Sequence, residues 1–132
     1  MTMANKKKRR PYLFCKSNLH VMVTNDDRSW FAQGLEIDYA VEDTSLKDMK
    51  QRFQEGVALT AKNYLKIHGN IKALLVRAPA DLWNEFYEAS SHPKYVHVSL
   101  HPVDDIPEFS GLQLPFKKVE YVTLYKYNRK SA

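Results

Sequence analysis

One amphipathic helix constrains this chain more than any other feature of its sequence. Apolar residues recur in steps of three and four over residues 45–68, the spacing that places side chains on one side of an α-helix. Ser45 has the position of an N-cap, with Asp48 three residues later, and Gly69 is placed to end the helix in a left-handed conformation. Such a helix would be about 36 Å long, and a small β-sheet offers its stripe a surface to pack on. The predicted stripe comprises Leu46, Met49, Phe53, Val57, Ala61, Tyr64 and Leu65.

The residues before this helix predict a three-stranded antiparallel meander. Residues 18–24 and 35–41 both alternate in the period-2 pattern of a β-strand. The polar turn 25–29 separates them from extended structure that resumes at Trp30, where Gly34 predicts a bulge or bend. We therefore expect an α+β fold, in which a β-β-β-α core packs the long helix on one face of a small antiparallel sheet. The two faces are predicted as Leu19, Val21 and Val23 against His20, Met22 and Thr24, and as Leu35, Ile37, Tyr39 and Val41 against Glu36, Asp38 and Ala40.

The pattern is weaker after the helix. Residues 70–79 are short and apolar, and the sequence leaves strand and loop both open. A short second helix is predicted over residues 80–90, after Pro79, and additional C-terminal strands are predicted over 95–101 and 116–127. The short helix carries Leu82, Trp83, Phe86 and Tyr87. We expect its three aromatic side chains to lie in the core rather than to anchor a partner.

Length and composition suit a single domain. We place this domain at residues 11–132, behind a solvated basic arm at residues 1–10. No apolar run approaches the roughly 20 residues that cross a bilayer, and the basic start is not followed by the apolar segment of a secretion signal. Cys15 is the single cysteine and cannot form an internal disulfide, which is typical of a reducing compartment. We therefore expect a cytoplasmic protein.

The net charge of +5 combines regions of opposite sign. Residues 1–16 carry six cations and no acid, and residues 117–132 carry five cations against Glu120. The middle of the chain, residues 17–116, holds fourteen acidic side chains against nine basic ones. An acidic body with basic ends can attract partners of either charge to different places.

No motif in the sequence requires catalysis. Carboxylates crowd the predicted sheet, where strand acids can hold Mg²⁺ in a nuclease; they are Asp26, Asp27, Glu36, Asp38 and Asp43. His97 and His101 would share a strand face, but the five histidines lack an HExxH spacing or a cysteine partner. There is no GxSxG elbow and no glycine-rich phosphate loop. We read the acids as a solvated face and expect a protein without catalytic activity, metal or cofactor.

Two basic segments favour nucleic-acid binding as an alternative function. The affinity of the KKKRR cluster for phosphate would be independent of sequence and steeply dependent on salt. The last predicted strand interleaves tyrosines with cations, which suits stacking on bases, although tyrosine also packs well on any pleated surface. The candidate contacts are Lys6, Lys7, Lys8, Arg9, Arg10, Lys126, Arg129 and Lys130.

The central part of the chain resembles the HicB-like family, the antitoxins of HicA/HicB modules and their single-domain relatives. The resemblance spans about residues 18–90 and is carried by "WFAQGLEIDYA", "EDTSLKDMKQRFQEG" and "APADLWNEFYEA". The chain departs from the family at "GLEIDYA", which replaces a proline- and glycine-rich turn, and at Glu42, which replaces a glycine before the helix. Residues 91–132 contain no recognisable DNA-binding helix pair or ribbon, so operator binding is not carried over. The matching positions are Trp30, Ala32, Gln33, Leu35, Glu36, Asp38, Thr44, Ser45 and Phe53.

The resemblance implies a function in binding. HicB-type antitoxins cover the active surface of small basic RNA-cleaving toxins of the HicA type, and an acidic body has the complementary sign to steer such a partner. An exposed edge strand also makes a homo-oligomer conceivable. The expected partner surface is acidic and comprises Glu36, Asp38, Glu42 and Asp43.

Overall fold

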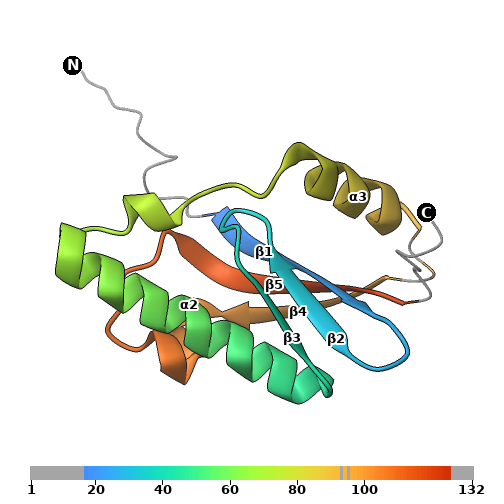
Figure 1. The fold of residues 1–132 in the computed structure, drawn as a ribbon, viewed down its shortest axis with the longest axis horizontal. Helices are drawn as coiled ribbons and strands as arrows, with labels where there is room; N and C mark the ends of the chain where they lie inside the picture. Colours follow the sequence, from blue (N-terminus) through green and yellow to red (C-terminus); the bar gives the residue numbers. More distant parts are fainter. Residues whose placement is uncertain (1–16, 93, 95, 126–132) are drawn as a thin grey trace.

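A computed structural model describes residues 17–92, 94 and 96–125 and contains one five-stranded sheet in the order β3-β2-β1-β5-β4. Helix α2 packs along one face of this sheet and α3 lies on the other face (Figure 1). The predicted α+β class is therefore confirmed. The elements are β1 Ser17–Asn25, β2 Trp30–Gly34, β3 Ala40–Asp43, α2 Leu46–His68, η1 Lys72–Leu74, α3 Ala80–Ser90, β4 Val96–Pro102, η3 Val103–Asp105, η4 Pro107–Phe109 and β5 Phe116–Leu124.

The predicted meander is present at one side of the sheet. β1 pairs antiparallel with β2, and β2 pairs antiparallel with β3, so that Val23, Ala32 and Val41 lie opposite one another in turn. β5 lies on the other side of β1 and runs parallel to it, with Val21 opposite Tyr121. The sheet is therefore mixed, because the chain makes a long crossover through both helices before β5 enters beside β1.

Both ends of α2 carry the predicted caps. The Ser45 hydroxyl accepts a hydrogen bond from the Asp48 backbone N–H at 2.9 Å, and Gly69 has a φ of 77° while its N–H donates to the Leu65 carbonyl. The stripe is buried along most of its length, but Leu65 is 39% exposed. The prediction that Leu65 belongs to the buried stripe is therefore wrong. The buried residues of the helix are Met49, Phe53, Val57, Ala58 and Ala61.

Residues 35–39 form a bend where the sequence predicted a strand. β2 ends at Gly34, whose N–H donates to the Tyr39 carbonyl at 2.8 Å, and β3 begins only at Ala40. Leu35 therefore packs in the α3 cluster and Ile37 in the α2 cluster, although the alternation had placed them on one face. The bend is held by the segment that leads from α2 to α3, through Asp38 N–H to the Val76 carbonyl and Ala78 N–H to the Leu35 carbonyl.

Strand β1 has the two faces that its alternation predicted, and both of them face described core residues. Leu19, Val21 and Val23 lie in the cluster under α2, whereas Met22 lies in the cluster under α3 with Trp83 and Phe86. The short helix thus contributes two of its aromatics to the core, but Tyr87 is 59% exposed. Neither described helix combines enough length with enough hydropathy to traverse a bilayer.

Candidate functional site

Two of the four predicted acidic residues lie exposed beside the edge strand β3. Asp38, just before this strand, accepts a hydrogen bond from the Gln33 side-chain amide at 3.0 Å. Glu42, within the strand, accepts one from the Ser29 hydroxyl at 2.7 Å. Within the described part of the chain neither carboxylate forms an ion pair. We call these two residues the β3 acidic edge.

Asp43 is occupied at the start of α2. Its carboxylate accepts the Thr44 backbone N–H at 2.7 Å and lies 3.4 Å from the Arg52 guanidinium. The hydrogen bond from Thr44, and then the contact with Arg52, hold the pKa of the Asp43 carboxyl below its ordinary value. Asp43 therefore fixes the turn from β3 into α2 and is less available to a partner than the β3 acidic edge.

Glu36 is held by an internal partner on the α3 side of the sheet. One of its carboxylate oxygens accepts the His20 backbone N–H at 2.8 Å, and the other lies 2.7 Å from the His20 ring Nδ1. Only 19% of the Glu36 side chain is exposed. The structure thus brings Asp38 and Glu42 to one exposed edge and ties Glu36 and Asp43 to other groups.

His20 is the centre of a polar network that the sequence analysis missed. Its Nε2 lies 3.6 Å from a carboxylate oxygen of Glu120, which also accepts a hydrogen bond from the Asn18 amide at 3.1 Å. The hydrogen bond with Glu36 raises the pKa of His20 against the opposing effect of burial, and attraction to both carboxylates adds to the rise. The ring also packs edge-on against Phe86, at 6.0 Å between centroids. This arrangement favours the protonated form of the His20 ring and joins α3 to the sheet.

A second polar cluster lies on the opposite face of the sheet, under α2. The Tyr121 hydroxyl accepts a hydrogen bond from the Gln54 amide at 2.9 Å, and the Lys50 ammonium lies 4.9 Å from the Tyr121 ring centre. His101 packs edge-on against the same ring and shares a 2.8 Å hydrogen bond with Ser99. Burial, and then the charge of Lys50, lower the pKa of His101, and burial raises the pKa of Tyr121. The cluster surrounds the buried Tyr121 ring and packs against the core, so we do not consider it an open binding site.

A metal centre is not formed by these groups. Across the residues that the structure describes, no three His, Cys, Asp or Glu side chains converge to hold an ion. His97 and His101 do share a face of β4, as predicted, but they contact different rings, Tyr125 and Tyr121.

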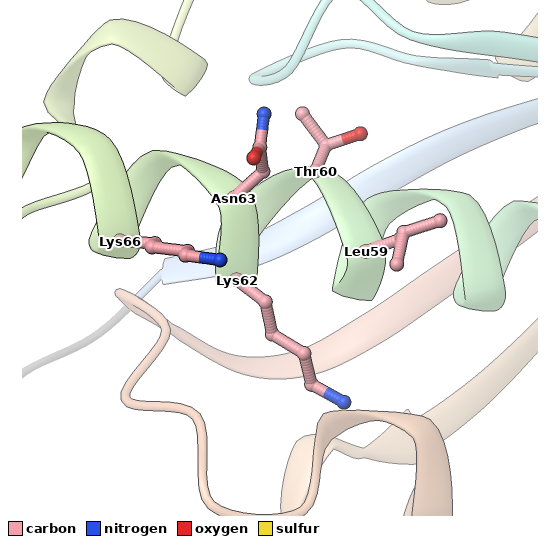
Figure 2. Close-up of a pocket in the computed structure, with 5 residues that line it drawn as sticks. All are labelled: Leu59, Thr60, Lys62, Asn63 and Lys66. Atoms are coloured by element: carbon pink, nitrogen blue, oxygen red, sulfur yellow. The ribbon is translucent and has the colours of Figure 1, made fainter.

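The predicted nucleic-acid contacts lie outside the described residues, both the arm at 6–10 and the cations Lys126, Arg129 and Lys130. A further basic surface lies on the C-terminal half of α2, where Lys62 and Lys66 are exposed and no acid occurs between residues 56 and 80. Lys62 and Lys66 project from the solvent side of the helix and line a shallow depression (Figure 2). Its remaining lining residues are Leu59, Thr60 and Asn63. A helical-wheel count of charge alone would have found this surface.

The fold and surface define an α+β protein with a helix on each face of its sheet and an acidic edge beside β3. No protein-family model matches the chain, and no curated protein or solved structure does either.

Proposed function

We propose that this protein is a non-catalytic, HicB-like binding protein whose β3 acidic edge docks a small basic protein in the cytoplasm. The observation that carries the proposal is the exposure of Asp38 and Glu42, whose carboxylates meet only neutral donors among the described residues. The Arg52 guanidinium reaches the Glu42 backbone carbonyl at 3.3 Å, but neither carboxylate forms an ion pair with a described residue. Both therefore remain available to a positively charged partner.

The proposed mechanism is occlusion. A basic protein would be steered to the β3 acidic edge and held there by charge pairs that become stronger as water leaves the contact. No bond would be made or broken, and a small RNA-cleaving toxin would lose access to its substrate while bound. The resemblance to HicB-type antitoxins supports this class of partner.

The test is affinity purification of the tagged full chain from its native host after nuclease treatment. We expect a small basic protein to be retained by the wild type and lost from the double variant Asp38→Lys, Glu42→Lys. The matched control is Asp104→Lys with Asp105→Lys, which changes the net charge equally at another exposed pair. Retention that responds equally to both double variants would show a general charge effect and contradict the docking surface.

The absence of catalysis is tested separately. We expect the purified chain to leave RNA and DNA intact in the presence of Mg²⁺. Cleavage that is abolished by Asp38→Asn would overturn the binding function and make the acidic edge a catalytic one.

We propose nucleic-acid binding as a second candidate, supported by the basic surface on α2. Lys62 and Lys66 lie one helical turn apart, and no acid occurs between residues 56 and 80 to offset them. Together with the basic arm at residues 6–10, they would contact phosphates without regard to base sequence.

This candidate predicts a retarded nucleic-acid probe in a mobility-shift assay at low salt. Lys62→Glu with Lys66→Glu should weaken binding and reduce the salt dependence by about 0.9 per lost phosphate contact on duplex DNA. Lys47→Glu with Lys94→Glu is the matched control at two other exposed lysines. A shift that survives both the α2 variant and deletion of residues 1–10 would exclude these surfaces.

A further inference from the structure

Among the residues that the structure describes, the second edge of the sheet, strand β4, has few of the features that normally prevent edge strands from pairing. β4 spans seven residues, Val96–Pro102, and contains no Lys, Arg, Asp or Glu. Its pairing with β5 is continuous from Val96 to Pro102 without a bulge. Natural sheets usually protect an edge with charge, proline, a bulge, shortness or a covering segment, and β4 carries a proline at its end, Pro102. Among the described residues no strand adds to the outer side of β4.

The side chains of β4 supply an apolar surface next to this free edge. Val98 and Leu100 are 47% and 48% exposed. Their opposite residues on β5 are Val122 and Glu120, on the face where α3 packs. The helix reaches Val122 and Val96 but leaves Val98 and Leu100 about half open to solvent.

We propose that β4 is a homodimerisation edge, at which two copies of this chain join antiparallel to make one continuous ten-stranded sheet. We choose a second copy as the partner because two β4 strands, paired antiparallel with Ser99 at the centre, place apolar residues opposite apolar residues. A two-fold axis through Ser99 places Val98 opposite Leu100 of the second copy and Leu100 opposite its Val98. These half-exposed apolar side chains would then cover each other on one face, with no charge left opposite an apolar group.

The symmetry restricts the register further. A two-fold axis perpendicular to the sheet keeps each face of one copy on the same face of the other, so residues of equal parity must pair. Centring on Ser99 pairs all seven residues of the strand, whereas a register shifted by two residues pairs only five of them. Pro102 has no N–H to donate, which ends the ladder there.

The expected dimer is weak and concentration-dependent. One strand pair buries less surface than the roughly 800 Å² per partner of a typical stable interface, so we expect a dissociation constant in the micromolar range or above. Analytical ultracentrifugation of the full chain, from about 1 µM to several hundred µM, should show a monomer that becomes a dimer. A wild-type chain that stays monomeric throughout this range would overturn the proposal.

Charge placed on the edge should abolish the dimer. Val98→Lys with Leu100→Lys puts like charges opposite each other across the two-fold axis. Both positions are about half exposed, so we expect the core to stay intact. The matched control is Leu59→Lys with Ile67→Lys, which replaces two apolar side chains that are 71% and 63% exposed on α2. Circular dichroism checks that both variants fold. A dimer that persists in the β4 variant, or is lost equally in the control, contradicts this edge as the interface.

Cysteine cross-linking tests the register. In a Cys15→Ser background, Ser99→Cys should form a disulfide-linked dimer under mild oxidation, because the two Cα atoms face each other across the axis within bonding range. His97→Cys should not, since residue 97 faces residue 101 of the second copy and lies about 13 Å from its own counterpart. Cross-linking at 97 but not at 99 would overturn the proposed pairing.

Discussion

Strands β3 and β4 form the two edges of one sheet, yet they offer opposite surfaces. β3 has four residues, of which two are acidic, and the exposed carboxylate of Asp38 lies just before it. β4 has seven residues, none of them Lys, Arg, Asp or Glu, with apolar Val98 and Leu100 about half exposed. A short charged edge discourages the addition of a like strand, whereas a long uncharged edge invites it. In our two proposals, β3 would therefore recruit a basic partner by charge and β4 would pair with a second copy of the chain.

The largest expected effect separates the two edges by mutation. Asp38→Lys with Glu42→Lys should lower retention of the basic partner more than tenfold, as expected when charge pairs become repulsions of several kcal/mol, and leave the dimer unchanged. Val98→Lys with Leu100→Lys should do the reverse. Partner capture and ultracentrifugation measure both effects on four proteins: the wild type, the two double variants, and the control Asp104→Lys with Asp105→Lys. Loss of both functions in either variant would mean that the edges act as one site.

The next effect concerns the support of β3. A Cβ at Gly56 would overlap the Tyr39 phenol, which packs on Phe53 at 5.6 Å between ring centroids and directly precedes β3. Gly56→Ala should therefore destabilise the fold by about 1–2 kcal/mol, the overlap outweighing the gain in helix propensity. Urea denaturation measures the change, and amide exchange should show β3 loosened more than β4. Gly69→Ala is the control. An alanine at this position is strained by the φ of 77°, but its Cβ meets no atom within 4 Å, so this variant tests backbone strain without an overlap. An unchanged or raised stability for Gly56→Ala would contradict the packing.

Glu36 should stabilise the bend before β3 in a pH-dependent way. Because Glu36 raises the pKa of His20 in the folded state, the stability from this pair is fully present below the unfolded pKa of about 6.5 and is lost as the pH rises through the folded pKa. Glu36→Gln should lower the unfolding free energy by about 1–2 kcal/mol at pH 5.5 and by less at pH 8.5. Denaturant titrations at both pH values test this, and an equal loss at both would exclude the ion pair as the cause.

The smallest expected effect is a change in the pKa of His101, on the face of β4 that is covered by α2. Burial and the charge of Lys50 lower the pKa of His101, so the folded state loses stability as the pH falls below the unfolded pKa of His101. Lys50→Met should raise the pKa of His101 toward its ordinary value and leave that of His20 in place. NMR titration of the ring protons measures both, with Lys47→Met as an exposed control. A His101 pKa that stays or falls would contradict the charge contact.

Local signals explain which parts of the fold could be predicted from the sequence. The caps of α2 at Ser45 and Gly69 depend on residues within one turn of each end, and the alternation of β1 depends only on neighbours along the strand. The bend at Leu35–Tyr39 could not be predicted in the same way, because its alternation also fits a strand. What decides it is the pairing with Val76 and Ala78, about forty residues away.

The candidate site depends still more on distant pairing. From the sequence, Glu36 is predicted as a solvated acid, whereas in the structure the bend places its carboxylate against His20. Glu120 reaches the same ring because β5 pairs beside β1. β4 could be predicted as a strand, but its place at the edge follows from the order of the whole sheet. The sequence predicted all four acids as one surface, and charge alone could not separate the exposed Asp38 and Glu42 from Glu36 and Asp43, which have internal partners.

The most direct test of the contrast between the edges is hydrogen–deuterium exchange of the full chain in dilute and concentrated solution. If β4 pairs with a second copy and β3 does not, the backbone amides of Val96–His101 should exchange more slowly at high concentration, while those of Ala40–Asp43 keep their rate. Exchange that is independent of concentration at β4, or that slows at β3, would contradict the assignment of different partners to the two edges.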